Sequence, residues 1–159
     1  MAITLETLLV KEEVSQLRLA YSAYFDGGDL DALVDLFTED AVCDFGDYGK
    51  WEGRDVIREQ YRANIALVGE AFDSLHIVTN PWITVTGPDT AHGRWYLVDC
   101  LTRQTPANGT VTPGGHANPL MYLALYEDDY RKVGDVWKIA YTRLHFLWPN
   151  RAFNGLAHP

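Results

Sequence analysis

The sequence is short of basic charge and of long apolar runs. Its 13 Lys and Arg residues face 22 Asp and Glu residues, and the formal net charge is -9. A nucleic acid or an anionic membrane needs a clustered basic surface, and the basic residues here are scattered, so both partners are disfavoured. No segment has the run of about eighteen apolar residues that a spanning helix needs, and the first residues lack a secretory signal. We therefore expect a cytoplasmic protein.

Cysteine and metal-binding patterns are also scarce. The two cysteines, Cys43 and Cys100, lie far apart and form no CxxC motif. We expect both to be reduced, small core residues rather than a disulfide. The five histidines show none of the spacings typical of a metal site. The sequence therefore predicts neither a structural nor a catalytic metal.

Aromatic and apolar residues are plentiful. Of the 159 residues, 47% are hydrophobic and 13% are aromatic. This length and composition are typical of one globular domain with one core, so we expect a single domain over residues 1–159. The supply of rings suits either a thick core or an aromatic-lined cavity.

The first part of the chain predicts a helix hairpin. Apolar residues at helical spacing indicate a helix from about Thr4 to Phe25, with an inward stripe of Val10, Val14, Leu17, Tyr21 and Tyr24. Gly27 and Gly28 supply a left-handed stop, and Asp29 is a good N-cap. We expect it to begin a second helix that carries inward Leu30, Leu33, Val34 and Phe37.

The rest of the chain predicts one more helix and then strands. Residues Ala41 to Phe45 are β-prone, "EGRDVIREQYRANIALVG" is typical of a third helix ending near Gly69, and four β-prone segments follow: "DSLHIVTNPWITVTG", "TAHGRWYLVDCL", "PLMYLALYEDDYRKVG" and "DVWKIAYTRLHFL". Helices first and long antiparallel strands second favour an α+β layer with a curved sheet on one face of the helices. The open end of such a cone is a ready pocket.

Two residues raise a question of chemistry. Asp26 precedes a Gly-Gly pair, and Asp-Gly is a common turn dipeptide. However, a carboxylate in the last turn of a helix faces the negative end of the helix dipole and favours a positive or hydrogen-bonding partner nearby. His76 is a candidate partner. Strand alternation puts it on the face of Val78 and Asn80, which lines either a cavity or solvent.

Several segments in this order resemble the SnoaL-like family of the nuclear-transport-factor-2-like superfamily: "Y..YFDGGDLDALVDLFTEDAV", "WEGRDVIRE", "LHIVTNPWITV", "HGRWYLV" and "YRKVGDVWKIAYTRL". The resemblance runs from about Val10 to Phe146. It implies a cone-shaped α+β barrel, in which a strongly curved mixed sheet wraps around three N-terminal helices. The nearest pattern is the group of scytalone dehydratase, bile-acid dehydratases and hexachlorocyclohexane dehydrochlorinase.

That group pairs an Asp at the end of the first helix with a His on the strand after the third helix, and the matching positions are Asp26 and His76. A carboxylate that accepts the Nδ1 hydrogen of an imidazole leaves Nε2 free as a general base, so no cofactor is required. Tyr21, as a proton donor, completes the expected catalytic set. The expected substrate-binding residues are Tyr24, Phe45, Leu97, Asp99, Tyr122 and Arg143. The second histidine of scytalone dehydratase has no clear counterpart, so its detailed chemistry is not carried over.

These features predict a cofactor-independent lyase, dehydratase-like or dehydrohalogenase-like, that acts on a small apolar cyclic or aromatic substrate. An isomerase or polyketide cyclase using the same base, and a non-catalytic ligand-binding protein, are the alternatives. Tyr21 and Arg143 also have structural readings, as a core ring and as a member of a surface ion pair. The apolar tail, residues 147–159, is expected to cover the pocket or to pack on another subunit of a homo-oligomer, a trimer or a dimer.

Overall fold

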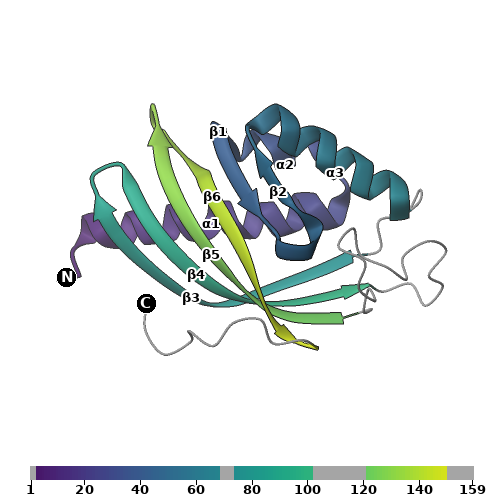
Figure 1. Ribbon diagram of the computed structural model, residues 1–159. Coiled ribbons are helices and arrows are strands. Elements are labelled where there is room, and N and C mark those ends of the chain that lie inside the picture. Colours follow the sequence, from purple (N-terminus) through teal and green to yellow (C-terminus); the bar gives the residue numbers. More distant parts are fainter. Residues whose placement is uncertain (1–2, 69–73, 102–120, 150–159) are drawn as a thin grey trace.

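The fold combines helices and one mixed sheet. The computed structural model describes residues 3–68, 74–101 and 121–149. Along these ranges the elements are α1 (Leu5–Gly27), α2 (Leu30–Asp35), β1 (Phe37–Asp44), the short 3-10 helix η1 (Gly46–Tyr48), β2 (Lys50–Glu52), α3 (Arg54–Val68), β3 (Ser74–Gly87), β4 (Thr90–Leu101), β5 (Met121–Val133) and β6 (Val136–Trp148) (Figure 1).

The six strands form one curved sheet in the order β2-β1-β6-β5-β4-β3. Strands β1 and β6 are parallel, and every other neighbouring pair is antiparallel. The predicted α+β fold, with three helices and a curved mixed sheet, is confirmed. The sheet does not close into a full barrel, because β2 and β3 remain as its two edges.

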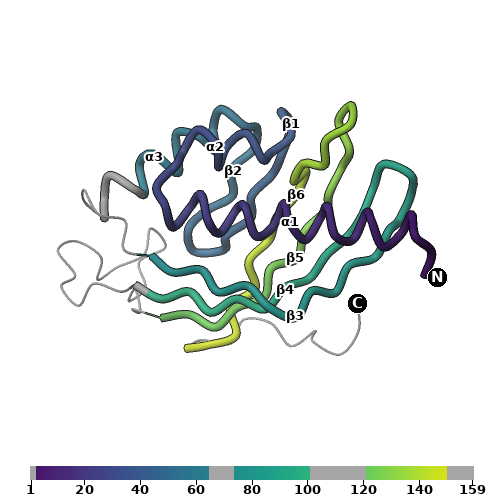
Figure 2. The backbone as a smooth tube through the Cα atoms, turned by 180° about the vertical axis from the view of Figure 1, so that it is seen from behind, coloured from purple at the N-terminus to yellow at the C-terminus, as the bar shows by residue number. Residues whose placement is uncertain are grey.

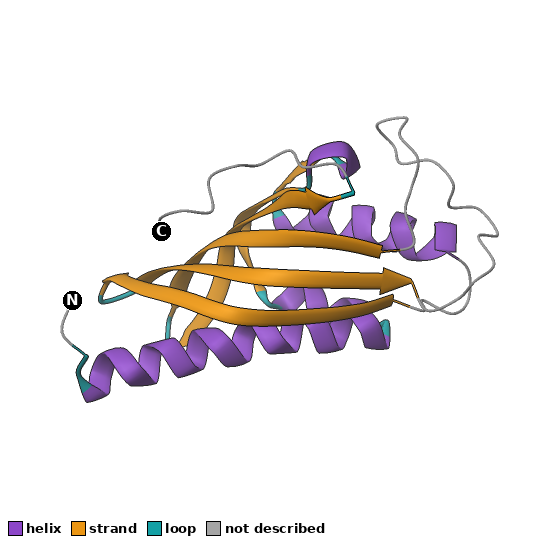
Figure 3. Ribbon diagram, turned by 90° about the horizontal axis from the view of Figure 1, so that it is seen from below, coloured by secondary structure: helices purple, strands orange, loops and turns teal. Residues whose placement is uncertain are grey.

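The helices lie against the concave side of this sheet. Figure 2 shows α1 running across the strands, and the view from below in Figure 3 shows the long strands lying over it. Helix α1 packs mainly on β3, and α3 packs on β1. Strand β3 bends where its pairing with β4 shifts between Thr79 and Trp82, at Asn80, which has a φ of 52°. Asn tolerates this left-handed conformation better than most residues.

The predicted hairpin of α1 and α2 is confirmed at its caps. The side chain of Thr4 accepts a hydrogen bond from the Thr7 backbone N–H at 3.2 Å and begins α1. Gly28 ends α1 with a φ of 70°, and Asp29 caps α2 by accepting the Ala32 N–H at 3.1 Å. The chain therefore reverses direction directly after Asp26.

The expected extent of the second helix was wrong at Phe37. Helix α2 ends at Asp35, and Phe37 is the fully buried first residue of β1. The Ile139 N–H donates to the Leu36 carbonyl at 2.8 Å, so pairing with β6 holds the chain extended from this point. Phe37 can reach the core from a strand or from a helix. The helical spacing of the apolar residues alone therefore did not distinguish a strand from a helix at this position.

The core contains one buried ion pair beside its apolar residues. Arg18 and Asp128 are both 0% exposed, with 3.6 Å between Arg18 Nε and Asp128 Oδ2. The guanidinium lies between the rings of Tyr21 and Tyr126, with Cζ 4.3 Å and 3.4 Å from their centroids. Asp128 also accepts hydrogen bonds from buried hydroxyls, those of Tyr130 and Thr142, both at 2.6 Å.

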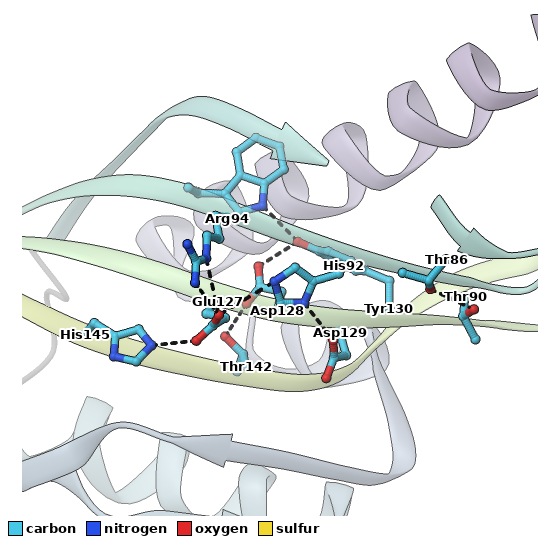
Figure 4. A network of polar contacts seen from close by, with 11 residues as sticks. Thr86, Thr90, His92, Arg94, Glu127, Asp128, Asp129, Tyr130, Thr142 and His145 are labelled. Carbon is cyan, nitrogen blue, oxygen red and sulfur yellow. Dashed lines mark hydrogen bonds and ion pairs between the residues drawn. The ribbon is translucent and has the colours of Figure 1, made fainter. Parts of the chain in front are cut away.

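A second polar network covers the outer side of the same strands. His92 Nδ1 lies 2.9 Å from Asp129 Oδ1, and Glu127 lies 2.9 Å from Arg94 Nη2 and 2.8 Å from His145 Nε2 (Figure 4). Because side chains alternate along a strand, these residues point away from Asp128 and the core. The sheet thus carries one polar network on each face.

Two expectations about composition can be compared with the structure. Both cysteines are free thiols; Cys43 is buried and Cys100 is partly buried. Burial raises the pKa of the Cys43 thiol. Among the described residues, no helix is both long enough and apolar enough to cross a membrane.

Candidate active site

Asp26 and His76 meet where the end of α1 lies against the start of β3. Asp26 Oδ1 is 2.6 Å from His76 Nδ1, and Asp26 Oδ2 accepts the backbone N–H of His76 at 2.8 Å. One carboxylate therefore holds both the imidazole and the backbone of the same residue. These two hydrogen bonds offset the unfavourable position of a negative charge at the C-terminal end of a helix.

Strand register places three site residues in one row. His76 on β3 lies opposite Asp99 on β4, and Asp99 lies opposite Tyr122 on β5. Directly opposite residues share a face of the sheet, and this face is turned toward α1. The imidazole is only 6% exposed. The row brings together an imidazole, a carboxyl group and a phenol from three strands.

The contacts of His76 fix its tautomer. The ionised carboxylate of Asp26 only accepts, so Nδ1 carries the hydrogen and Nε2 presents a lone pair. Nε2 lies 3.8 Å from Oδ2 of Asp99, which is too long for a direct hydrogen bond. A base and a second carboxyl group therefore face each other across a short gap.

Asp99 has a perturbed acidity. Burial raises the pKa of this carboxyl group, and the neighbouring carboxylate of Asp26 adds to the rise. The imidazole of His76 and the hydroxyl of Ser74 oppose it. The raised pKa makes the neutral, proton-donating form of this carboxyl group more accessible than it is for an ordinary aspartate.

Aromatic rings surround this row. The Phe25 ring meets the imidazole edge-on, with 4.4 Å between centroids, and the Tyr122 ring is 5.2 Å from that of Phe146. Tyr48, from η1, shares a very short hydroxyl contact with Tyr122. Burial raises the pKa of both phenols, so both remain protonated near neutral pH.

The structure does not bring every expected site residue to the row. Tyr21 is buried more deeply and its hydroxyl lies 2.9 Å from that of Tyr61. Phe45 packs edge-on against Trp51 in the core, whereas Leu97 is buried on the same face of β4 as Asp99.

Two further residues lie outside the row. Tyr24 is 36% exposed on α1, and Phe25 contacts the imidazole in its place. Arg143 points to the outer side of β6, where its side chain is 49% exposed and its Nε is 3.3 Å from Asp44 Oδ2. This is the surface ion pair that the sequence analysis left open as the alternative.

Sequence reasoning missed three residues beside the dyad. Ser74 was detectable, because it stands two positions before His76 and so shares its face of β3. Phe25 was adjacent to Asp26 but was assigned only as the end of the helix. Tyr48 had no signal, since its position depends on how η1 folds back toward β5.

Some expectations fall outside the described residues. The tail expected to cover the pocket is described only up to Pro149. Among the described residues, no group of three or more His, Cys, Asp or Glu side chains is arranged to hold a metal ion.

Solved structures with similar folds include three informative cases. A candidate scytalone dehydratase from Novosphingobium aromaticivorans aligns with a TM-score of 0.75 at 20% identity, over 99% of this chain and 99% of its own. A type 2 hexachlorocyclohexane dehydrochlorinase aligns with a TM-score of 0.73 at 15% identity, over 98% and 96%. A protein of unknown function from Mycobacterium tuberculosis aligns with a TM-score of 0.71 at 24% identity, over 89% and 73%.

No curated protein matches the sequence. The SnoaL-like domain matches residues 6–143, which include Asp26 on α1 and the full row of His76, Asp99 and Tyr122. The expected family is thereby confirmed. This chain belongs to the SnoaL-like domain family.

Proposed function

We propose that this protein is a cofactor-independent lyase that removes water from a small apolar cyclic or aromatic substrate. The observation that carries the proposal is the line of groups from Asp26 through His76 to Asp99, with 2.6 Å from Asp26 Oδ1 to His76 Nδ1 and 3.8 Å from His76 Nε2 to Asp99 Oδ2. Similarity to a dehydrochlorinase and to a candidate scytalone dehydratase supports elimination as the reaction class.

In this proposal His76 Nε2 takes a proton from a carbon next to a carbonyl or aryl group. The electron pair of that C–H bond forms the new double bond, and the C–O bond on the adjacent carbon breaks. Asp99 Oδ2 gives its proton to the departing oxygen, which leaves as water. Asp26 stabilises the imidazolium that forms and keeps the ring oriented.

The same pair of groups can be reset without an external acid. After elimination, the imidazolium of His76 and the carboxylate of Asp99 face each other, and Nε2 returns its proton to Oδ2. The pair then holds one proton as before.

Aromatic surroundings support an apolar ring as the substrate. Phe25 and Leu97 flank the dyad with apolar surface, and the phenols of Tyr48 and Tyr122 offer polar contacts on the side of Asp99. Apolar walls with a few placed polar groups are typical of small-molecule sites.

We also predict a homo-oligomer, a trimer or a dimer, which sedimentation velocity would measure.

The experiment has two stages. First, the protein is incubated with a panel of small cyclic β-hydroxy ketones and aryl carbinols, and mass spectrometry detects loss of one water. Then His76→Ala, Asp26→Asn and Asp99→Asn are assayed on the substrate found. Each of the first two is expected to lower kcat by about 10²- to 10⁴-fold, the usual contribution of a positioned general base.

The matched control is His92→Ala. His92 belongs to a second His-Asp pair, with Asp129, on the outer face of the sheet. This variant should retain wild-type turnover. Full activity of both His76→Ala and Asp26→Asn would overturn the assignment. A product of unchanged mass that still requires His76 would instead identify an isomerase or cyclase.

A further inference from the structure

Ser74 lies beside the dyad and contacts both His76 and Asp99. It is the first residue of β3 and is buried on the same face as His76. Its Oγ is 3.0 Å from His76 Nδ1 and 3.5 Å from Asp99 Oδ1. Ser74 is not a member of the apolar core cluster formed by the described residues.

The direction of its hydrogen bond follows from its neighbours. Asp26 Oδ1 lies closer to His76 Nδ1 than Ser74 does, at 2.6 Å, and an ionised carboxylate can only accept. Nδ1 therefore carries the hydrogen and cannot accept one from Ser74. The hydroxyl hydrogen of Ser74 goes to Asp99 Oδ1, the remaining acceptor within reach among the described residues.

This contact distinguishes the two oxygens of Asp99. Oδ1 is occupied as an acceptor from Ser74, whereas Oδ2 lies 3.8 Å from His76 Nε2. A neutral carboxyl group has a single proton and two oxygens on which to carry it. An oxygen that accepts a hydrogen bond from a fixed donor is the less favourable site for that proton, so the proton resides on Oδ2.

We propose that Ser74 is a positioning residue, which holds the Asp99 carboxyl so that its acidic proton lies on Oδ2, on the side of His76 Nε2 and of the reacting atoms beside the pair. This inference rests on the proposed function, because it assigns Ser74 a part in the proton transfer by Asp99. It requires no contact between Ser74 and the substrate.

The proposal makes a distinctive prediction about acidity. A hydroxyl that donates to a carboxyl group favours its ionised form, and Ser74 lowers the pKa of Asp99 against the rise caused by burial. Ser74→Ala should therefore raise the pKa of Asp99 further. The alkaline limit of activity, where Asp99 loses its proton, should move to higher pH, while the maximal kcat falls because the carboxyl group is free to rotate.

The first test needs no substrate. Carboxyl groups of aspartate are labelled with ¹³C, and the Asp99 signal is assigned by its absence in Asp99→Asn. Its titration is then compared in the wild type, Ser74→Ala and Ser74→Thr. We expect the pKa of Asp99 to rise in Ser74→Ala and to remain at the wild-type value in Ser74→Thr, which keeps the hydroxyl. The signal of Asp128 reports whether each variant is folded.

The second test uses the substrate found for the wild type. Ser74→Ala should lower kcat by about 3- to 10-fold, the loss expected for one hydrogen bond, with KM unchanged. Ser74→Thr should restore kcat and the pH profile. If Ser74→Ala leaves both the titration of Asp99 and the pH profile unchanged, Ser74 does not position the carboxyl group. If His76→Ala retains activity, the proposed function fails, and the titration still reports on Ser74 independently.

Discussion

Replacing Arg18 by Met would leave Asp128 as an uncompensated buried charge. Both side chains are 0% exposed, and the guanidinium is the only cation within ion-pair distance of Asp128 in the described part of the chain. Met has a similar length and packs well between Tyr21 and Tyr126, so the apolar contacts are largely retained. Most of the expected change in stability is therefore electrostatic.

The size of the loss follows from what Asp128 can do in response. Removing one partner of a buried pair typically costs about 3–5 kcal/mol. Asp128 can limit the loss by taking up a proton, and this costs about 1.4 kcal/mol for each pH unit above its unfolded pKa of about 3.9. The loss in the free energy of unfolding of Arg18→Met is therefore at most about 4 kcal/mol at pH 7 and about 1.5 kcal/mol at pH 5.

The sign of the pH dependence can be worked out from Asp128. Burial raises the pKa of this carboxyl, and Arg18 is the strongest influence that opposes the rise. Without Arg18 the folded pKa rises further above the unfolded value. A carboxyl with a raised folded pKa destabilises the fold at high pH, and the effect fades as pH falls toward the unfolded pKa. The difference in the free energy of unfolding between the wild type and Arg18→Met should therefore become smaller as the pH is lowered.

Urea unfolding followed by tryptophan fluorescence at about pH 5 and about pH 7.5 would measure both free energies of unfolding. The control is the double variant Arg18→Met with Asp128→Asn, which removes both charges and should recover most of the stability at the higher pH. A loss below about 1 kcal/mol for Arg18→Met, equal at both pH values, would refute the reasoning.

Three further predictions concern stability. Asp29→Ala removes the N-cap of α2 and should lower the free energy of unfolding by about 0.5–2 kcal/mol in urea titrations, whereas Asp29→Asn should not. Gly93→Ala should lower the melting temperature, because its Cβ would stand 2.9 Å from the Tyr130 ring, and Tyr130→Leu should reduce that effect. The hydrogen bond to Asp129 raises the pKa of His92. Protonated His92 therefore stabilises the folded protein fully below about pH 6.5, and this contribution is lost as the pH rises. His92→Gln should therefore lower the melting temperature more at acidic than at alkaline pH, and a pH-independent change would contradict this.

Local signals in the sequence predicted much of the fold. Gly28 and Asp29 marked the turn between α1 and α2 because left-handed glycines and capping carboxylates act within a few residues. Alternation grouped His76 with Val78 on one face of its strand but left open whether that face lines a cavity or solvent. The boundary at Phe37 could not be predicted in this way, since it depends on pairing with β6, more than a hundred residues later.

The residues that were misplaced or missed depend on tertiary structure. Arg18 falls within the apolar stripe of α1, and an arginine there would ordinarily be expected at the surface. Its burial follows from Asp128, whose position is set by the register of β5. Arg143 was expected near the substrate, but on β6 it is the preceding residue, Thr142, whose side chain is buried. A shift of one residue in a strand exchanges its two faces.

The carboxylate of Asp26 also accepts a backbone hydrogen bond from an edge strand of the sheet, β3. Among the described residues, β3 pairs with β4 alone, so backbone donors on its other side have no strand partner there. At His76 that donor is already bonded to Asp26. A variant that lacks the carboxylate would remove the partner of this backbone donor and the nearest partner of His76 Nδ1. In the proposed function, Asp26 therefore orients the imidazole and also binds a backbone donor at the edge of the sheet.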